Sequence, residues 1–203
     1  LGTQERVLYG KGFIEDTLCG LRFAISPRSF YQVNPIQTEA LYQRAIQMAQ
    51  LTGRERVLDA YCGIGTIGLT ASDKARQVVG VEVNRDAVRD AIGNAKHNGV
   101  KNARFFAADA TAWIREAADA GQKADVVFMD PPREGSTPAF LESVARMAPK
   151  RIVYVSCNPE TMARDLALLT QKGYRAEGFT PVDLFPQTAH CEVAVSYTHL
   201  TLP

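Results

Sequence analysis

Short apolar runs alternate with longer stretches of helical periodicity from about Gln37 onward. The apolar runs predict strands at Arg56–Ala60, Val78–Val83, Arg104–Ala107, Ala124–Met129, Arg151–Ser156, Tyr174–Val182 and Cys191–Tyr197. The periodic stretches predict helices at Ile36–Leu51, Ile67–Asp73, Arg85–Asn98, Thr111–Ala120, Pro138–Met147 and Pro159–Gln171. Apolar strands that alternate with helices predict an α/β fold, in which a mainly parallel, seven-stranded sheet is covered on both faces.

The two ends of the chain lack this alternation. Residues 1–35 contain short apolar pieces, Gly12–Ile14 and Leu21–Ile25, separated by glycines, and we expect a β-rich leader that is the remnant of a preceding region. Residues 36–195 then form the catalytic domain. Residues 196–203, with the sequence SYTHLTLP, show no periodicity, and we expect them to be a non-native tail.

Composition restricts the class of protein only loosely. A length of 203 residues suits one domain with a sizeable core. The net charge of +1 does not by itself predict a nucleic-acid partner. The four cysteines form no C-x-x-C pair, so we expect no metal site and a reduced, cytoplasmic enzyme.

A glycine-rich loop follows the strand at Arg56–Ala60 and opens a helix. In DAYCGIGTIG, residues Gly63, Gly65 and Gly68 fit the pattern G-x-G-x-x-G, which allows a ligand to approach the backbone closely. Glu82 ends the next strand, where a carboxylate can accept hydrogen bonds from both hydroxyls of a ribose. These features fit a nicotinamide dinucleotide as well as S-adenosyl-L-methionine (AdoMet).

Three acidic residues at further strand ends favour AdoMet. Asp59 precedes the glycines, where it can meet the amino-acid portion of this cofactor, and Asp109 is placed to meet the adenine amino group. Asp130 opens the string DPPR at the end of the fourth strand. Ligands of open α/β sheets bind beyond these carboxyl ends. Asp109 taken alone fits a helix N-cap equally well.

A cysteine and a glutamate are candidates for the chemistry. Cys157, in YVSCNP, lies between a strand and a helix, where the helix dipole favours a thiolate nucleophile, although a free cysteine is often only a small buried residue. Glu192, in HCEVAV, is a candidate base of raised pKa, or a solvent-facing residue of an alternating strand. We assign His190 to hydrogen bonding and both Cys62 and Cys191 to packing.

Five motifs together resemble one known family. SFYQVNP, DAYCGIGTIG, DPPREG, YVSCNP and HCEVAV occur in this order, and the resemblance to the RNA uridine-5-methyltransferases covers nearly all of 10–195. The bacterial enzymes that act on 23S ribosomal RNA are especially similar. The resemblance implies a Rossmann-like methyltransferase fold, AdoMet as cofactor, and RNA, 23S ribosomal RNA in particular, as partner.

The resemblance also implies a role for each matching residue. Cys157 would be the nucleophile that adds to the uracil ring, and Glu192 would be the base that removes the proton from carbon 5. Arg133 would support the site or the RNA. The residues that would contact AdoMet are Gln32, Tyr61, Gly63, Thr66, Glu82, Asp109 and Asp130. Thr66 stands where relatives often carry asparagine, which puts its side-chain contact in doubt.

Two other functions remain open at this point. An amino-group methyltransferase carries a similar Asp-Pro-Pro motif, but that motif usually ends in an aromatic residue where this chain has Arg133. A nicotinamide-dependent oxidoreductase or a dinucleotide-binding module fits the glycines alone. Full-length members of the resembled family carry an N-terminal β-barrel that binds RNA, and some carry an iron–sulfur cluster; we expect neither within these 203 residues.

Overall fold

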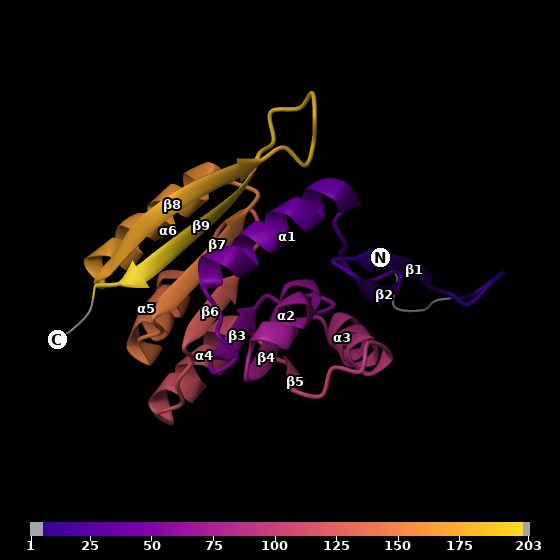
Figure 1. Cartoon of the computed structure of the whole chain (residues 1–203), viewed down its shortest axis with the longest axis horizontal. Coiled ribbons are helices and arrows are strands. Elements are labelled where there is room, and N and C mark those ends of the chain that lie inside the picture. Colours follow the sequence, from indigo (N-terminus) through magenta and orange to yellow (C-terminus); the bar gives the residue numbers. More distant parts are fainter. Residues whose placement is uncertain (1–5, 201–203) are drawn as a thin grey trace.

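The computed structural model describes residues 6–200, which form one large sheet with helices on both faces and a separate hairpin (Figure 1). The strands are β1 (Ile14–Leu18), β2 (Leu21–Ile25), β3 (Arg56–Ala60), β4 (Gln77–Glu82), β5 (Ala103–Ala107), β6 (Val126–Met129), β7 (Arg151–Ser156), β8 (Tyr174–Val182) and β9 (Glu192–His199). The helices are α1 (Pro35–Ala49), α2 (Thr66–Ala71), α3 (Arg85–His97), α4 (Ala110–Asp119), α5 (Pro138–Met147) and α6 (Pro159–Gln171), with a 3-10 turn, η1, at Ser72–Lys74.

Seven strands form the large sheet in the order β5-β4-β3-β6-β7-β9-β8. The pairs from β5 to β7 are parallel, whereas β9 runs antiparallel to both β7 and β8. The sheet is therefore mainly parallel, as the sequence predicted. Its one reversed strand begins at the edge where the parallel strands end.

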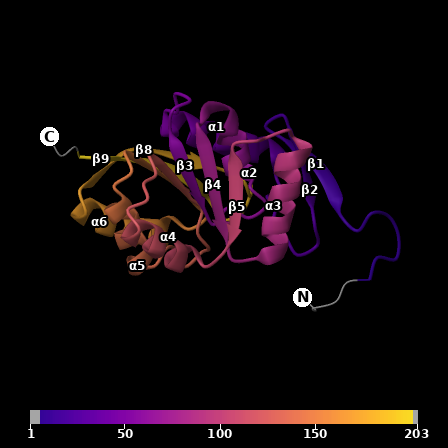
Figure 2. The ribbon, with the colours of Figure 1, turned by 90° about the horizontal axis from the view of Figure 1, so that it is seen from below.

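Alternating residues of the strands pack into two separate cores, one on each face. Val57, Val78 and Phe128 join the buried side chains of α1, α2 and α3, while their neighbours Leu58 and Val127 join those of α4, α5 and α6. A view from below shows the two groups of helices on either side of the strands (Figure 2). Within residues 6–200, no helix has the length and apolar character needed to cross a membrane.

Local sequence sets where most helices begin. The side chains of Asn34, Asn84, Asp109, Thr137 and Asn158 each accept a backbone N–H at the start of α1, α3, α4, α5 and α6. Such caps satisfy N–H groups that have no partner inside the helix. Helix α2 differs, because it follows Gly65 in a left-handed conformation and has no side-chain cap.

The hairpin β1–β2 is held to the large domain through helix α3. Asn94 Oδ1 accepts the N–H of Ala24 at 2.8 Å, and Asn98 Oδ1 accepts the N–H of Arg22 at 2.9 Å. The amide nitrogens of the two asparagines donate in return to the carbonyls of the same two residues. Because residues four apart share a helix face and residues two apart share a strand edge, α3 pairs with β2 much as a third strand would.

The structure agrees with the sequence-based elements within two residues at their ends, with corrections near both termini. β1 begins at Ile14, so the expected strand piece at Gly12–Ile14 is wrong, and the true strand runs through Leu18. β9 continues through His199, so the first four residues of the expected tail belong to the sheet. Their non-native origin stays a prediction, and residues 1–5 and 201–203 lie outside the described part.

Candidate active site

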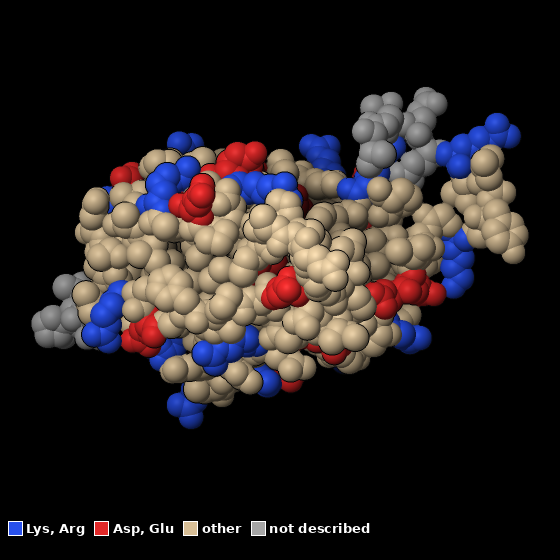
Figure 3. Space-filling model, turned by 90° about the horizontal axis from the view of Figure 1, so that it is seen from above, with Lys and Arg blue, Asp and Glu red and all other residues tan. Residues whose placement is uncertain are grey.

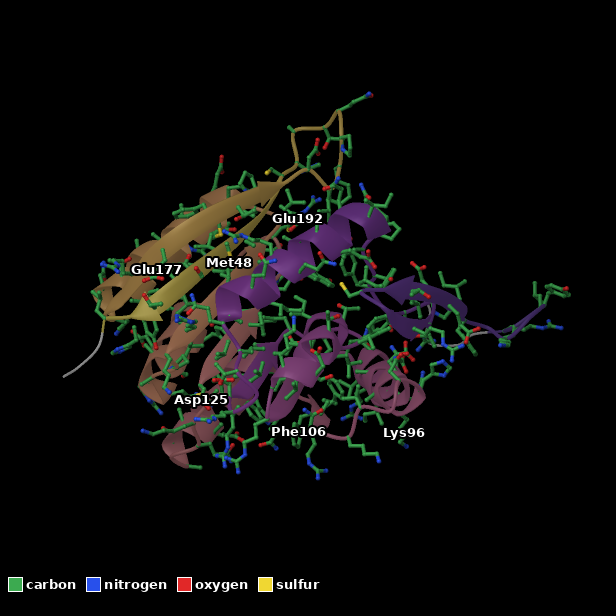
Figure 4. The ribbon with its side chains drawn as sticks, viewed as in Figure 1. Met48, Lys96, Phe106, Asp125, Glu177 and Glu192 are labelled. Atoms are coloured by element: carbon green, nitrogen blue, oxygen red, sulfur yellow. The ribbon has the colours of Figure 1, made fainter. Side chains whose placement is uncertain are left out.

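The loops after the parallel strands bring several predicted site residues to one edge of the sheet. Glu82 ends β4, Asp130 follows β6, and Cys157 follows β7. Because β9 is antiparallel, its first residue, Glu192, lies at the same edge, where Figure 4 labels it beside the loop from β8. The register pairs Ser156 with Val193, so Cys157 and Glu192 are neighbours of paired residues.

One cleft at this edge gathers most of the predicted cofactor residues. Its lining includes Gln32, Tyr61, Gly63, Thr66 and Asp130. Although it lies in a loop, Gln32 is only 7% exposed. The contributing segments are far apart in the sequence, and the sheet order brings them together.

The glycine loop depends on the missing side chains of two glycines. Gly65 has φ +85°, and a Cβ there would lie 3.0 Å from the ring of Phe105. A Cβ on Gly68 would lie 2.7 Å from the Asp59 carboxylate, which accepts the Gly68 N–H at 2.8 Å. By contrast, a Cβ on Gly63 would meet no atom within 4 Å. The backbone at Gly63 is therefore open to a ligand.

Asp59 is a buried carboxyl below this loop. Its side chain is 1% exposed, and Oδ1 has no hydrogen-bond partner in the part of the chain described. Burial raises the pKa of Asp59 to about 7, the bond from Gly68 opposes this rise, and the charge of Glu82 adds to it. The structure shows that Asp59 orders the loop through the bond from Gly68, and its predicted contact with the cofactor stays a prediction.

Glu82 joins the glycine loop to the end of β4. Its Oε2 accepts the N–H of Gly63 at 3.1 Å, and its Oε1 accepts the N–H of Asn84 at 2.8 Å. A carboxylate oxygen can accept two hydrogen bonds. Each oxygen of Glu82 therefore retains acceptor capacity for a ligand hydroxyl.

Asp109 and Glu82 lie outside the lining of the cleft, whereas Thr66 belongs to it. Asp109 is exposed, lies outside the lining of the cleft, and caps α4 by accepting the N–H of Ala112 at 2.8 Å. The N-cap alternative is thus confirmed, and a ligand contact would use the remaining carboxylate capacity. The Thr66 hydroxyl lies 3.1 Å from the hydroxyl of Tyr42. Sequence reasoning missed Tyr42, because a tyrosine on the buried face of an amphipathic helix carries no signal beyond packing.

Cys157 is half-buried between β7 and the N-terminus of α6. Burial raises the pKa of its thiol, the charges of Glu192 and Asp130 raise it further, and the side chain of Arg133 opposes the rise. This direction is opposite to the one expected from the helix dipole. Desolvation and two nearby carboxyls disfavour the thiolate, and Arg133 is the group that favours it.

Glu192 is 3% exposed, so its solvent-facing alternative is wrong. Burial raises the pKa of Glu192, and the charge of Arg133 opposes the rise. Its Oε2 has no hydrogen-bond partner among the described residues. A carboxylate whose pKa is raised by burial is a stronger base than an exposed one, so the prediction of a base role for Glu192 stays open.

Asp130 follows β6, which lies in the sheet between β3, the strand of Asp59, and β7, the strand before Cys157. Burial raises its pKa well above the usual range, and the charges of Glu192 and Asp59 raise it further. A positively charged ligand would relieve the mutual repulsion of these carboxyls. The cleft is therefore suited to a cation.

The remaining residues singled out in the sequence lie outside this cluster or pack below it. His190 is exposed, with its ring centroid 6.3 Å from that of Phe185. Cys62 is buried in one core, and Cys191 packs against the other. Both cysteines thus have the packing role expected for them.

Comparisons with known proteins agree with this geometry. The family described as tRNA (Uracil-5-)-methyltransferase matches residues 3–199. Two proteins described as uncharacterized RNA methyltransferases are each 53% identical: one from Listeria monocytogenes, over 98% of this chain, and one from Caldanaerobacter subterraneus, over 95%. The chain spans 44% and 42% of the lengths of these two relatives.

A solved structure is similar over almost the whole chain. It is the tRNA (uracil-54, C5)-methyltransferase of Pyrococcus abyssi in complex with S-adenosyl-L-homocysteine, with 34% identity and a TM-score of 0.81. The alignment covers 94% of this chain and 45% of that one. The fold and the arrangement of the site are thus those of the RNA methyltransferases. The chain belongs to the tRNA (uracil-5-)-methyltransferase family, and neither alternative function agrees with that membership.

Proposed function

We propose that this protein transfers a methyl group from AdoMet to carbon 5 of a uridine in RNA, through a covalent bond between Cys157 and the uracil ring. The main support is the β7–β9 register, which puts Cys157 and Glu192 at neighbouring strand ends. Asp130 of the adjoining cleft is close enough to raise the thiol pKa. The proposed nucleophile, the proposed base and the cleft therefore lie at one edge of the sheet.

The residues of the cleft, together with Glu82, which accepts the N–H of Gly63, fit AdoMet. The open backbone at Gly63, the unpaired Oδ1 of Asp59 and the remaining capacity of Glu82 provide surface, acceptors and negative charge. AdoMet, when bound, supplies an electrophilic methyl group on a positively charged sulfur. We propose that Gln32, Tyr61, Gly63, Thr66, Glu82 and Asp130 hold it, and that Asp109 meets the adenine amino group.

Cys157 would activate the ring in the first step. Carbon 5 of uracil is too weak a nucleophile to take a methyl group unaided. The Cys157 thiolate adds to carbon 6, and the electron pair of the 5,6 double bond then makes carbon 5 nucleophilic. Arg133 favours the thiolate in this step, because its positive charge offsets Glu192 and Asp130.

Glu192 would act after carbon 5 has received the methyl group. Its carboxylate takes the proton from carbon 5, the 5,6 double bond re-forms, and the bond to sulfur breaks to release the Cys157 thiolate. A raised pKa suits a base that must hold this proton. The target base has to leave its stack to reach the cleft, so we propose a flipped or single-stranded uridine.

The class of RNA is a separate part of the proposal. The sequence resemblance points to 23S ribosomal RNA, whereas the matching family and the Pyrococcus enzyme are named for tRNA. Methylation assays with unmodified transcripts of both RNAs decide between them. A cytoplasmic location, expected from the unpaired cysteines, stays a prediction.

The covalent step is tested by trapping. RNA that contains 5-fluorouridine should form a protein–RNA complex that survives denaturing electrophoresis, because fluorine cannot leave carbon 5 as a proton does. Glu192→Gln should accumulate the same complex on ordinary RNA, and Cys157→Ala should form none. The full-length Listeria relative, with the equivalent variants, serves as the control for weak RNA capture. Methylation by Cys157→Ala, or normal turnover by Glu192→Gln, would contradict the assigned roles.

A further inference from the structure

The loop at 130–136, between β6 and α5, carries both Asp130 and Arg133. Arg133 is an exposed residue, so packing does not fix it. Its main-chain carbonyl nevertheless accepts two hydrogen bonds, from Asn158 Nδ2 at 3.1 Å and from Thr161 Oγ1 at 3.0 Å. Both donors belong to the start of α6, directly after Cys157. The backbone of Arg133 is thus attached to the helix that follows the cysteine.

The next turn of α6 holds the rest of the loop. Arg164 Nη2 donates to the carbonyls of Glu134 at 2.9 Å and Ser136 at 3.2 Å. Asp165 Oδ2 accepts the N–H of Ser136 at 2.7 Å. A Cβ on Gly135 would lie 2.6 Å from Arg164 Nη2 and 2.7 Å from Asp165 Oδ2, so the loop approaches α6 as closely as a glycine permits.

Asp165 is the centre of this arrangement. Its carboxylate is 2% exposed and receives the hydroxyl of Tyr154 at 2.8 Å, while Arg164 Nε and Nη2 donate to Oδ1 at 2.9 and 2.7 Å. A buried carboxylate persists only when it is paired and hydrogen-bonded. Here these bonds join β7, α6 and the loop into one unit. The reaction proposed above uses none of these groups, which leaves their purpose unassigned.

We propose that Thr161, Arg164 and Asp165 form a clamp that holds Arg133 beside Cys157, with Asp165 as its central positioning residue. This inference rests on the proposed function for the role of Cys157. The side chains that hold the loop lie on one face of α6, because three or four residues separate them: Asn158 at the N-cap, Thr161, and the pair Arg164 and Asp165. Because the helix begins just after Cys157, the clamp fixes the guanidinium and the thiol relative to each other. Release of the loop would move the Arg133 guanidinium away from Cys157 and lower the fraction of Cys157 present as thiolate.

The test measures thiol reactivity, which needs neither RNA nor methyl transfer. Cys157 in this chain is alkylated with iodoacetamide between pH 6 and 10, and the labelled Cys157 peptide is followed by mass spectrometry. The rate of alkylation rises with pH as the thiol ionises, and the midpoint of this rise is the quantity compared. Asp165→Asn should shift the midpoint to higher pH, so that alkylation at pH 8 slows by roughly three- to tenfold, where tenfold corresponds to one pKa unit. Arg133→Met should give the same shift. The two substitutions combined should shift it no further than Arg133→Met alone.

A matched control separates positioning from stability. Tyr154→Phe removes the bond that Asp165 receives from β7, so it should lower the melting temperature and leave the midpoint in place. If Asp165→Asn does not fold, Thr161→Val removes a bond to the Arg133 carbonyl with little change in shape, and it should shift the midpoint in the same direction. A folded Asp165→Asn with an unchanged midpoint, or an unchanged midpoint in Thr161→Val, overturns the clamp. Methylation by Cys157→Ala would instead overturn the proposed function and leave the measured shift intact.

Discussion

Asp59 shows how one buried carboxyl can oppose stability and still suit a site for a cation. Unfolded, it titrates near its usual value of 3.8, and burial raises its pKa to about 7 in the folded protein. Between these values the unfolded chain releases a proton that the folded chain keeps, so stability falls as pH rises through this window and then levels off. The full difference is up to about 4 kcal/mol.

Asp59→Asn should therefore stabilise the protein more at pH 8.5 than at pH 5.5. The amide keeps an acceptor for the Gly68 N–H but carries no charge, so its advantage grows as the native carboxyl ionises. Melting temperatures at the two pH values measure the effect, with Asp183→Asn, an exposed carboxyl, as the control. The same variant should bind AdoMet more weakly in isothermal titration. A stability difference that does not change with pH would contradict a raised pKa.

At the level of single residues, the sequence indicated position in the fold better than environment. It identified Cys157, Glu192 and the DPPR string from their positions at strand ends, and the structure brings these to one edge. It could not decide whether Glu192 is buried, because an alternating strand has the same pattern at an edge and in a sheet interior. The answer depends on the whole sheet, in which β9 is an interior strand paired with β7 on one side and β8 on the other. The thiol pKa depends likewise on carboxyls from other strands.

Elements of the sheet were predictable because their patterns are local. Val- and Ile-rich runs and capping residues set the bounds of β3, β7, α5 and α6 without reference to the rest of the chain. The attachment of β2 to α3 was not predictable, since an asparagine on a helix surface usually contacts water. Only the fold shows that the face of Asp90, Asn94 and Asn98 meets a strand edge.

Asn94 tests this attachment. It is 1% exposed, serves both main-chain groups of Ala24, and donates to the Ile64 carbonyl at 3.4 Å in the glycine loop. Asn94→Ala leaves buried polar groups unpaired, so we expect a loss of about 2–3 kcal/mol in the free energy of unfolding. Asn98→Ala removes a similar pair of bonds at a more exposed place and should cost about 1 kcal/mol or less. Urea denaturation measures both losses. Equal losses would mean that the burial of Asn94 does not strengthen its contribution to stability.

For the molecule as a whole, charge and length bear on RNA capture. Lysines and arginines are scattered among acidic residues on the face seen in Figure 3, in agreement with the net charge of +1. A protein that neutralises many phosphates usually concentrates its basic residues. The chain spans less than half the length of its Listeria relative. We therefore expect the chemistry in this chain and much of the RNA affinity in the remaining length of such relatives.

The comparison of this chain with the full-length Listeria relative tests that division of roles. The relative should bind RNA more tightly, and its affinity should fall more steeply with salt, because each further neutralised phosphate adds about 0.7 to 0.9 to the slope of log K against log salt. AdoMet affinity should be similar in the two proteins, since the residues of the cleft lie within this chain. Binding is measured by fluorescence anisotropy on one labelled RNA at several salt concentrations, and by calorimetry for AdoMet. Equal RNA affinity and equal slopes would show that this chain captures its substrate by itself, despite its near-neutral charge.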